Sequence, residues 1–264
     1  MPSLWLTSDR PLNIAHRGAS AVAPPNTLAA FRRAADLGAD GVELDVHLSA
    51  DGVPVVIHDF TVDATTDGSG RVRDLPLAAL KALDAGSRFD PAFAGERIPT
   101  LEEVFAEVGG RLLVNVELKS MPGNDYPGLE AAVAALIRRH GLTNRVLVSS
   151  FNPFALRRFR REMPEVPIGF LYETAPLSCA ARLAAALVGL RPQAVHPWWR
   201  MITPQTVRWA HARGRRIVAW TVDDPAAIAR LAAWGVDAII TNHPDRMYRT
   251  LEPRSDPPKG GIIE

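Results

Sequence analysis

The chain has 264 residues, of which 47% are hydrophobic and 22% are charged, and these ordinary globular proportions exclude an intrinsically disordered protein. Its 30 basic and 29 acidic residues leave a formal charge of +1 and are scattered along the sequence, so we expect neither a nucleic-acid partner nor a membrane-surface partner. The single cysteine, Cys179, excludes an internal disulfide framework and a multi-cysteine metal cluster.

The N-terminal segment MPSLWLTSDRPLN has no basic stretch followed by a long apolar run, so the sequence predicts no secretory signal. The richest apolar segments, Ala131–Ile137 and Leu183–Leu190, are too short to cross a bilayer. We therefore expect a cytoplasmic protein without a stable membrane anchor; the sequence does not indicate an oligomeric state.

Apolar runs alternate with helical periods along the whole chain. Most of these runs are rich in Val, Ile and Leu and lack a polar alternation, which is typical of parallel strands covered on both faces. The expected strands are Leu12–His16, Gly41–His47, Val53–His58, Leu112–Lys119, Val146–Ser150, Ile168–Tyr172, Ala194–Trp198, Ile217–Val222 and Ala238–Thr241.

Helix signals separate the strands. A capping side chain followed by proline predicts three helix starts, since the cap satisfies free amides and proline needs no partner there. These pairs are Asn152-Pro153, Thr203-Pro204 and Asp224-Pro225. Thr100 with Glu103 predicts a capping box, and Asn26 or Thr27 begins another helix that Gly38 ends.

About eight strand–helix units in roughly 250 residues predict a single-domain α/β protein, the (β/α)8 TIM barrel. A doubly wound open sheet is the alternative, disfavoured because no Gly-rich phosphate fingerprint follows the first strand. We assign residues 1–252 to the barrel, with an irregular insertion at Phe60–Pro99 after the second-strand region, and residues 253–264 to a flexible C-terminal tail.

Histidines and an arginine stand where two of the strands end, and the active sites of such barrels lie at these carboxyl ends. His16 and Arg17 follow the first strand, and the planar guanidinium of arginine matches phosphate or carboxylate oxygens. His58 ends a later strand. Two histidines with pKa values near 6.5 can supply a base and an acid at neutral pH.

Two strands also carry acidic residues that point the same way. Glu43 and Asp45 are two positions apart, and a buried pair of carboxylates needs a cation or a proton. The pair suits a hard divalent ion, Mg²⁺ or Ca²⁺, and a salt bridge to Lys or Arg is the alternative. His47 comes two positions after Asp45, so its side chain faces the same way as those of Glu43 and Asp45. It either extends this row of polar side chains or lies at the solvated end of the strand.

The strand Leu112–Lys119 places Asn115, Glu117 and Lys119 on one face. Glu117 offers a third carboxylate and Lys119 a point charge for a phosphoryl oxygen; a buried Glu117–Lys119 pair without a substrate is the alternative. Later strand ends are aromatic or polar, and together they are interpreted as an apolar wall beside the site. They are Ser150-Phe151, Tyr172, Trp198-Trp199, Trp220-Thr221 and Asn242.

From about Asn13 to Asp245 the sequence resembles the glycerophosphodiester phosphodiesterase family. The segments that carry the resemblance are IAHRGAS, NTLAAFRRAADLGADGVELDVHLSADGVPVVIHD, VNVELK, VAWTVDD and DAIITNHPD, in this order. The resemblance implies a TIM barrel that uses a divalent cation to hydrolyse a small-molecule glycerophosphodiester to glycerol 3-phosphate and an alcohol. It also implies that the neighbouring hydroxyl of the substrate attacks first and that water opens the resulting cyclic phosphate.

Carried over by position, the resemblance implies roles for individual residues. Glu43, Asp45 and Glu117 correspond to metal ligands, His16 and His58 to the acid/base pair, Arg17 and Lys119 to phosphate-binding residues, and Trp220 to an aromatic residue of the substrate pocket. Phe151 joins Trp220 as a substrate-contacting candidate, because it also lies at a strand end.

One position departs from the family pattern. Glutamate usually precedes the Asn-Thr dipeptide after the first strand, whereas this chain has Pro25 there, which we interpret as the loss of a supporting carboxylate. Two other functions stay open: a lysophospholipase D or sphingomyelinase D-like phosphodiesterase on the same barrel, and a degenerate barrel that binds phosphodiesters without cleaving them.

Overall fold

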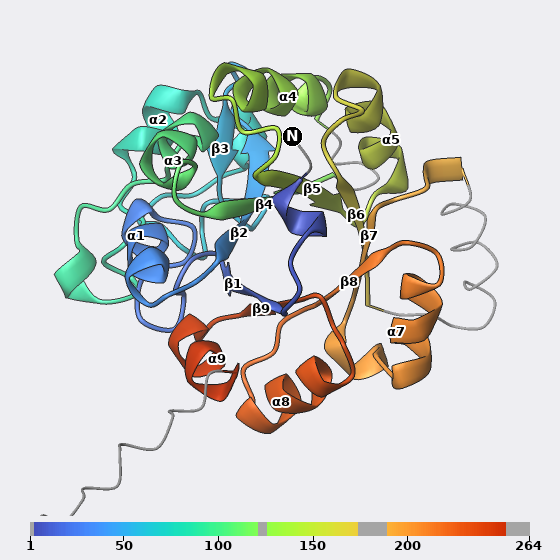
Figure 1. Cartoon of the computed structure of the whole chain (residues 1–264). Coiled ribbons are helices and arrows are strands. Elements are labelled where there is room, and N and C mark those ends of the chain that lie inside the picture. The colour runs from blue at the N-terminus through green and yellow to red at the C-terminus, as the bar shows by residue number, and fades with distance from the viewer. Residues whose placement is uncertain (1–2, 121–125, 174–188, 252–264) are drawn as a thin grey trace, which may run out of the picture.

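A closed parallel barrel forms the centre of the molecule (Figure 1), as seen in a computed structural model that describes residues 3–120, 126–173 and 189–251. The barrel closes because β1 (Leu12–His16) pairs with both β2 (Gly41–Leu48) and β9 (Ala238–Thr241). The wall continues from β2 to β9 through β4 (Leu113–Leu118), β5 (Val146–Ser150), β6 (Ile168–Tyr172), β7 (Ala194–Pro197) and β8 (Arg216–Ala219). The predicted (β/α)8 barrel is confirmed.

Helices surround this wall (Figure 1), and their apolar faces pack on the outer faces of the strands. They are α1 (Leu28–Asp36), α3 (Leu101–Val108), α4 (Leu129–Arg139), α5 (Pro153–Glu162), α7 (Pro204–His211), α8 (Pro225–Ala233) and α9 (Pro244–Leu251). The predicted caps form, since Thr27, Asn152 and Asp224 each accept from an amide in the first helical turn. The capping box of Thr100 and Glu103 is also present.

The strand expected at Val53–His58 is not a barrel strand. Only Pro54–Val56 forms a strand, β3, and it pairs antiparallel with the carboxyl end of β2, beyond the residues that pair with β1. A parallel neighbour needs a crossover of a dozen residues or more, whereas a short turn with Gly52 at φ +81° reverses the chain directly after β2. His58 therefore reaches the barrel rim from a hairpin.

Residues 57–99 follow β3 and contain η2 (Val72–Asp74), α2 (Leu77–Ala82) and η3 (Pro91–Phe93). Together with Val55 of β3 they form a small apolar cluster, whose other members are Ile57, Val62, Val72, Leu80 and Ile98. An ion pair between Lys81 and Glu103, at 2.7 Å, joins α2 to α3, so this segment lies against the outer helices (Figure 1).

The amino end of the barrel is closed by a short helical turn, η1 (Leu4–Leu6), which lies over the barrel centre (Figure 1). Trp5 donates from Nε1 to the carbonyl of Arg145 at 2.9 Å and packs on the apolar residues inside the barrel. Among the described residues, no helix is long and apolar enough to span a membrane. Cys179, residues 183–188 of the apolar segment Leu183–Leu190 and the tail 253–264 lie outside the described residues.

Candidate active site

A cavity of about 470 Å³ opens at the carboxyl ends of the barrel strands. Of the predicted catalytic, metal-binding and substrate-binding residues, all except Asp45 line it, namely His16, Arg17, Glu43, His58, Glu117, Lys119, Phe151 and Trp220. Asp45 is buried behind the surface of the cavity, where it pairs with Arg17 and Lys119. The structure thus brings together residues from both halves of the sequence.

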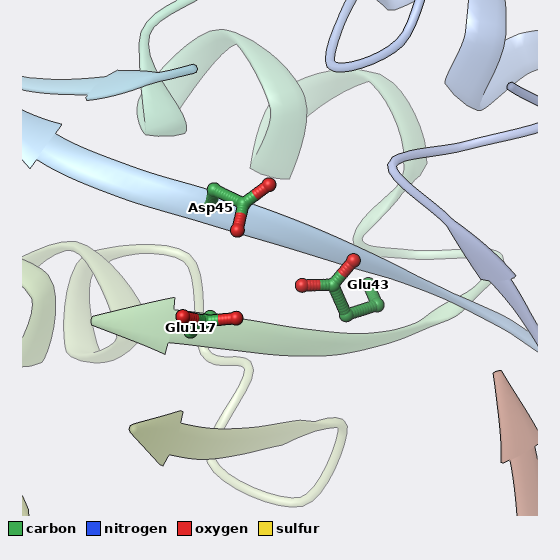
Figure 2. A group of neighbouring side chains, drawn as sticks. All are labelled: Glu43, Asp45 and Glu117. Atoms are coloured by element: carbon green, nitrogen blue, oxygen red, sulfur yellow. The ribbon is translucent and has the colours of Figure 1, made fainter. Parts of the chain in front are cut away.

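The three predicted metal ligands form one cluster, because Asp45 and Glu117 are register partners on β2 and β4 and Glu43 precedes Asp45 by two residues. Ligand oxygens of Glu43, Asp45 and Glu117 all lie within 4.8 Å of one another, and the carboxylates point toward a common space (Figure 2). Burial and the neighbouring carboxylates raise the pKa values of Glu43 and Glu117. Burial also opposes ionisation of Asp45, but Lys119 and Arg17 overcome it and lower the pKa of this carboxyl.

This charge arrangement fits a divalent cation. Against the three carboxylates, the described residues bring two cations, Arg17 and Lys119. Burial and the neighbouring carboxylates raise the pKa values of Glu43 and Glu117, so the cluster lacks positive charge that a metal ion would supply. Carboxylate oxygens are the ligands that Mg²⁺ and Ca²⁺ prefer.

Lys119 and Arg17 hold the carboxylates from two sides. Lys119 Nζ lies 2.9 Å from Glu117 Oε1 and 3.2 Å from Asp45 Oδ1, and Arg17 Nε lies 3.3 Å from Asp45 Oδ2. Burial disfavours the charged form of Lys119, but the two carboxylates outweigh it and raise its pKa. The Glu117–Lys119 pair expected as an alternative does exist, but it lines the cavity rather than a closed core.

The turn after β1 places Arg17 by an unusual backbone conformation. Arg17 itself has φ +54°, and its amide donates to Glu43 Oε2 at 3.2 Å. Gly18 follows at φ +83°, and a Cβ there would lie 2.6 Å from the backbone of Ala30 in α1. Only glycine fits at position 18, because the turn packs closely on α1.

Hydrogen bonds determine which ring nitrogen of His16 carries the proton. Asp223 can only accept, and it accepts from Asn242 Nδ2 at 2.6 Å, so the amide oxygen of Asn242 faces His16. That oxygen lies 2.7 Å from His16 Nδ1, which must therefore be the donor. Burial, with Arg17, lowers the pKa of His16 to about 4, so the ring is neutral and its Nε2 lone pair faces the cavity side, 3.9 Å from Glu43.

His58 has a carboxylate partner instead. Its Nδ1 lies 2.6 Å from Asp59 Oδ1, and this hydrogen bond, like the nearby charge of Asp45, favours the protonated ring. Burial outweighs both and lowers the pKa of His58 below its usual value. The two imidazoles therefore differ, since His16 has an amide partner and His58 a carboxylate.

His47 does not lie at a solvated strand end, contrary to one of the two expectations. It is fully buried, because β3 and Tyr126 cover it. Its Nε2 lies 3.0 Å from the carbonyl of His58, which can only accept, so Nε2 is the donor and Nδ1 accepts from Tyr126 Oη at 2.6 Å. His47 thus fixes the backbone that carries His58.

The other side of the cavity carries two aromatic side chains. Phe151 and Trp220 pack edge to face with ring centroids 5.5 Å apart, and Trp220 donates from Nε1 to the carbonyl of His196 at 2.7 Å. Leu171 and Ile240 also line the cavity, as do the polar residues Thr221 and Glu173. Tyr172, Trp198 and Trp199 are not among the residues that line the cavity, so the expected aromatic wall is smaller than the strand-end pattern indicated.

Sequence reasoning missed several supporting residues. Asn26, in the left-handed region at φ +60°, donates from Nδ2 to Asp45 Oδ2 at 2.9 Å, next to Pro25. Asn242 directly follows β9 and is among the strand ends that the sequence assigns to the wall beside the site, but no sequence signal marks it as the partner of His16. Asp223 lies four residues beyond the end of β8. Asn26 has no strand-end signal, because it comes from a loop.

This chain is similar to known proteins of one family in both sequence and fold. Residues 16–246 match the model of the glycerophosphoryl diester phosphodiesterase family. A glycerophosphodiester phosphodiesterase of Caldanaerobacter subterraneus is 44% identical over 244 residues, which cover 91% of this chain and 97% of that protein. The structure of an Oleispira antarctica phosphodiesterase in complex with the product sn-glycerol-3-phosphate superposes with a TM-score of 0.82 at 34% identity, covering 92% of this chain and 97% of the other. A glycerophosphodiester phosphodiesterase structure from Agrobacterium tumefaciens gives a TM-score of 0.77 at 32% identity, covering 89% and 97%.

Proposed function

The chain belongs to the glycerophosphoryl diester phosphodiesterase family, and we propose that it hydrolyses glycerophosphodiesters to glycerol 3-phosphate and an alcohol by metal-assisted catalysis with two histidines. One observation carries the proposal: the buried carboxylate cluster, two cations and two imidazoles with different partners all meet in one cavity. The product named for the Oleispira antarctica relative supports glycerol 3-phosphate as the product here.

Glu43, Asp45 and Glu117 would hold the divalent cation, either Mg²⁺ or Ca²⁺. When bound, the ion supplies positive charge that stabilises the negative charge growing on the phosphate oxygens in the transition state. Asn26 and Lys119 keep the Asp45 carboxylate in position through one hydrogen bond and one ion pair.

Arg17 and Lys119 bind the remaining phosphate oxygens. Both cations line the cavity, and both already neutralise carboxylates on its floor. Phe151 and Trp220 lie on the opposite side, where they contact the alcohol portion of the substrate. The phosphate therefore lies toward β1, β2 and β4, and the alcohol toward β5 and β8.

The histidines move the protons. His16 Nε2 accepts the proton of the glycerol hydroxyl next to the phosphate, whose oxygen then bonds to phosphorus. The bond from phosphorus to the alcohol oxygen breaks, and His58 gives its proton to that oxygen. This step uses the protonated form of the ring, which the carboxylates of Asp45 and Asp59 favour against burial. Water then donates a proton to His58 and attacks the cyclic phosphate, while His16 returns its proton to the glycerol oxygen. Both rings regain their starting states.

Product analysis tests the proposal. With Mg²⁺ or Ca²⁺ present, the purified protein should release glycerol 3-phosphate from glycerophosphocholine, as measured by a coupled dehydrogenase assay. A panel with ethanolamine, inositol and long-chain lysophospholipid esters defines the alcohol. Binding of glycerophosphocholine without any product would contradict the proposal, and a strong preference for the lysophospholipids would assign the chain to the phospholipase D-like alternative.

A further inference from the structure

Beneath the carboxylate cluster, the barrel interior contains three buried polar side chains that the mechanism above does not use. They are Asn115 on β4, Ser149 on β5 and His196 on β7, and at most 1% of each is exposed. Asn115 and Ser149 line the same cavity as the catalytic candidates. We call these three residues the polar floor.

Strand register places the polar floor directly next to the site. Asn115 is the register partner of Glu43, and Ser149 is the register partner of Glu117. Ser149 in turn pairs with Gly169 on β6, where a Cβ would lie only 2.3 Å from His196 Nε2. The imidazole of His196 thus occupies the space that a side chain at position 169 would take, beside Ser149.

The polar atoms of the floor have no hydrogen-bond partner among the described residues. This holds for both polar atoms of the Asn115 side chain, for Ser149 Oγ and for both ring nitrogens of His196. Buried polar groups in folded proteins are nearly always hydrogen-bonded, since an unmade bond is expensive. Three neighbouring side chains without partners, next to a cavity, indicate a place where a ligand or water supplies the missing bonds.

The chemistry of the floor selects the kind of group that fits. Asn115 and Ser149 are neutral, and burial lowers the pKa of His196 to about 3, so this ring is neutral as well. Together they offer both donors and acceptors without net charge. The nearby carboxylates repel an anion, and Leu171 and Ile240 add apolar surface to the lining of the cavity. A neutral hydroxyl, which both donates and accepts, matches this floor.

We propose that the polar floor binds the terminal hydroxyl of the glycerol moiety and so makes the site selective for glycerol over smaller or less polar diol groups. This inference rests on the proposed function. The phosphate bound by Arg17 and Lys119 and the reacting hydroxyl beside His16 leave the terminal hydroxyl as the one polar group of glycerol still without a partner.

A matched pair of substrates tests the inference. Glycerophosphocholine is compared with its 1,2-propanediol analogue, which keeps the reacting hydroxyl and lacks the terminal one. The wild-type kcat/KM should favour glycerol by about 10- to 100-fold, the range expected for one lost hydrogen bond at a buried site. Ser149→Ala and Asn115→Leu should each reduce this preference several-fold, and the inhibition constants of the corresponding free phosphate monoesters should change in parallel.

Ser150→Ala is the control. It removes a hydroxyl from the adjacent position of β5, but Ser150 donates to the carbonyl of Leu118, at 2.8 Å, so the preference should not change. Equal wild-type activity on both diesters, or a preference that Ser149→Ala and Asn115→Leu leave intact, would overturn the inference while the proposed function stands. No hydrolysis of either diester would instead refute the proposed function.

Discussion

The two ends of the barrel interior are built from the same strands and differ sharply in polarity. On β4, the inward residues change from Leu113 to Asn115 to Glu117 as the strand runs toward its carboxyl end. The amino end is packed with apolar side chains around Trp5, whereas the carboxyl end contains the carboxylate cluster. One interior therefore combines a stabilising half with a half whose buried charges oppose folding.

The largest effect on activity should come from a change at the carboxyl end of the barrel interior, at Glu43. Glu43→Gln keeps the size of the side chain but removes a metal ligand, so the activity of the variant should fall at least about 1,000-fold. The activity of the wild type in EDTA should fall by a similar factor. The metal-free variant should be no less stable than the metal-free wild type, because a buried carboxylate with a raised pKa is lost. Assays at several metal concentrations and thermal unfolding measure both effects.

Glu130→Gln is the matched control for Glu43, since each glutamate is 4% exposed. Glu130 pairs with Arg158 on the outside of the barrel at 2.8 Å, so its variant should lose stability and keep its metal dependence. Full activity of the wild type in EDTA would contradict the proposed metal site.

The histidine variants should have the next largest effect. His16→Ala and His58→Ala should each lower kcat by about 100- to 10,000-fold, because each removes one proton transfer, while inhibition by glycerol 3-phosphate persists. Steady-state kinetics give both values. His211→Ala, whose ring pairs with Asp237 before β9, should retain the wild-type kcat. Near wild-type turnover of either active-site variant would remove that histidine from the mechanism.

A change at the apolar amino end of the barrel interior should lower the stability and leave the activity intact. Leu147, 1% exposed, packs inside the barrel below Ser149, and Leu147→Ala should lower the free energy of unfolding by about 2–5 kcal/mol. Because Leu147 does not line the cavity, kcat of the folded variant should stay close to that of the wild type. Urea unfolding combined with kinetics at low temperature checks this, and a large loss of kcat with unchanged stability would argue against the separation of the two ends.

The smallest expected effect is a pH dependence of the free energy of unfolding. It comes from His196 of the polar floor, which lies between the two ends of the barrel interior. His196 has its pKa lowered by burial from 6.5 to about 3, so the unfolded chain binds a proton that the folded chain does not. This contribution is fully present above about pH 6.5 and decreases as the pH falls, by up to about 1.4 kcal/mol per pH unit. Between pH 7 and pH 5, His196→Gln should lose about 2 kcal/mol less stability than the wild type in urea unfolding. The same loss in both proteins would contradict a neutral His196.

Much of the site follows from local sequence. The parity of Glu43 and Asp45 on one strand, and of Asn115, Glu117 and Lys119 on another, requires only that the strands form, and the structure places these residues together as expected. The hairpin that delivers His58 was not predicted, because a short apolar run does not reveal whether its strand pairs parallel or antiparallel. The interactions of His47 with Tyr126 and with the His58 backbone depend on that hairpin as well.

The sequence by itself determined the barrel, its helix caps and the residue types at the carboxyl ends of the strands, since periodicity, capping and side-chain parity are local properties. The tertiary structure alone decided which atoms meet: Asn242 with His16, Asn26 with Asp45, and the imidazole of His196 over Gly169. These contacts join residues separated by many positions along the chain. Their geometry is set by strand register and barrel closure, which no short stretch of sequence encodes.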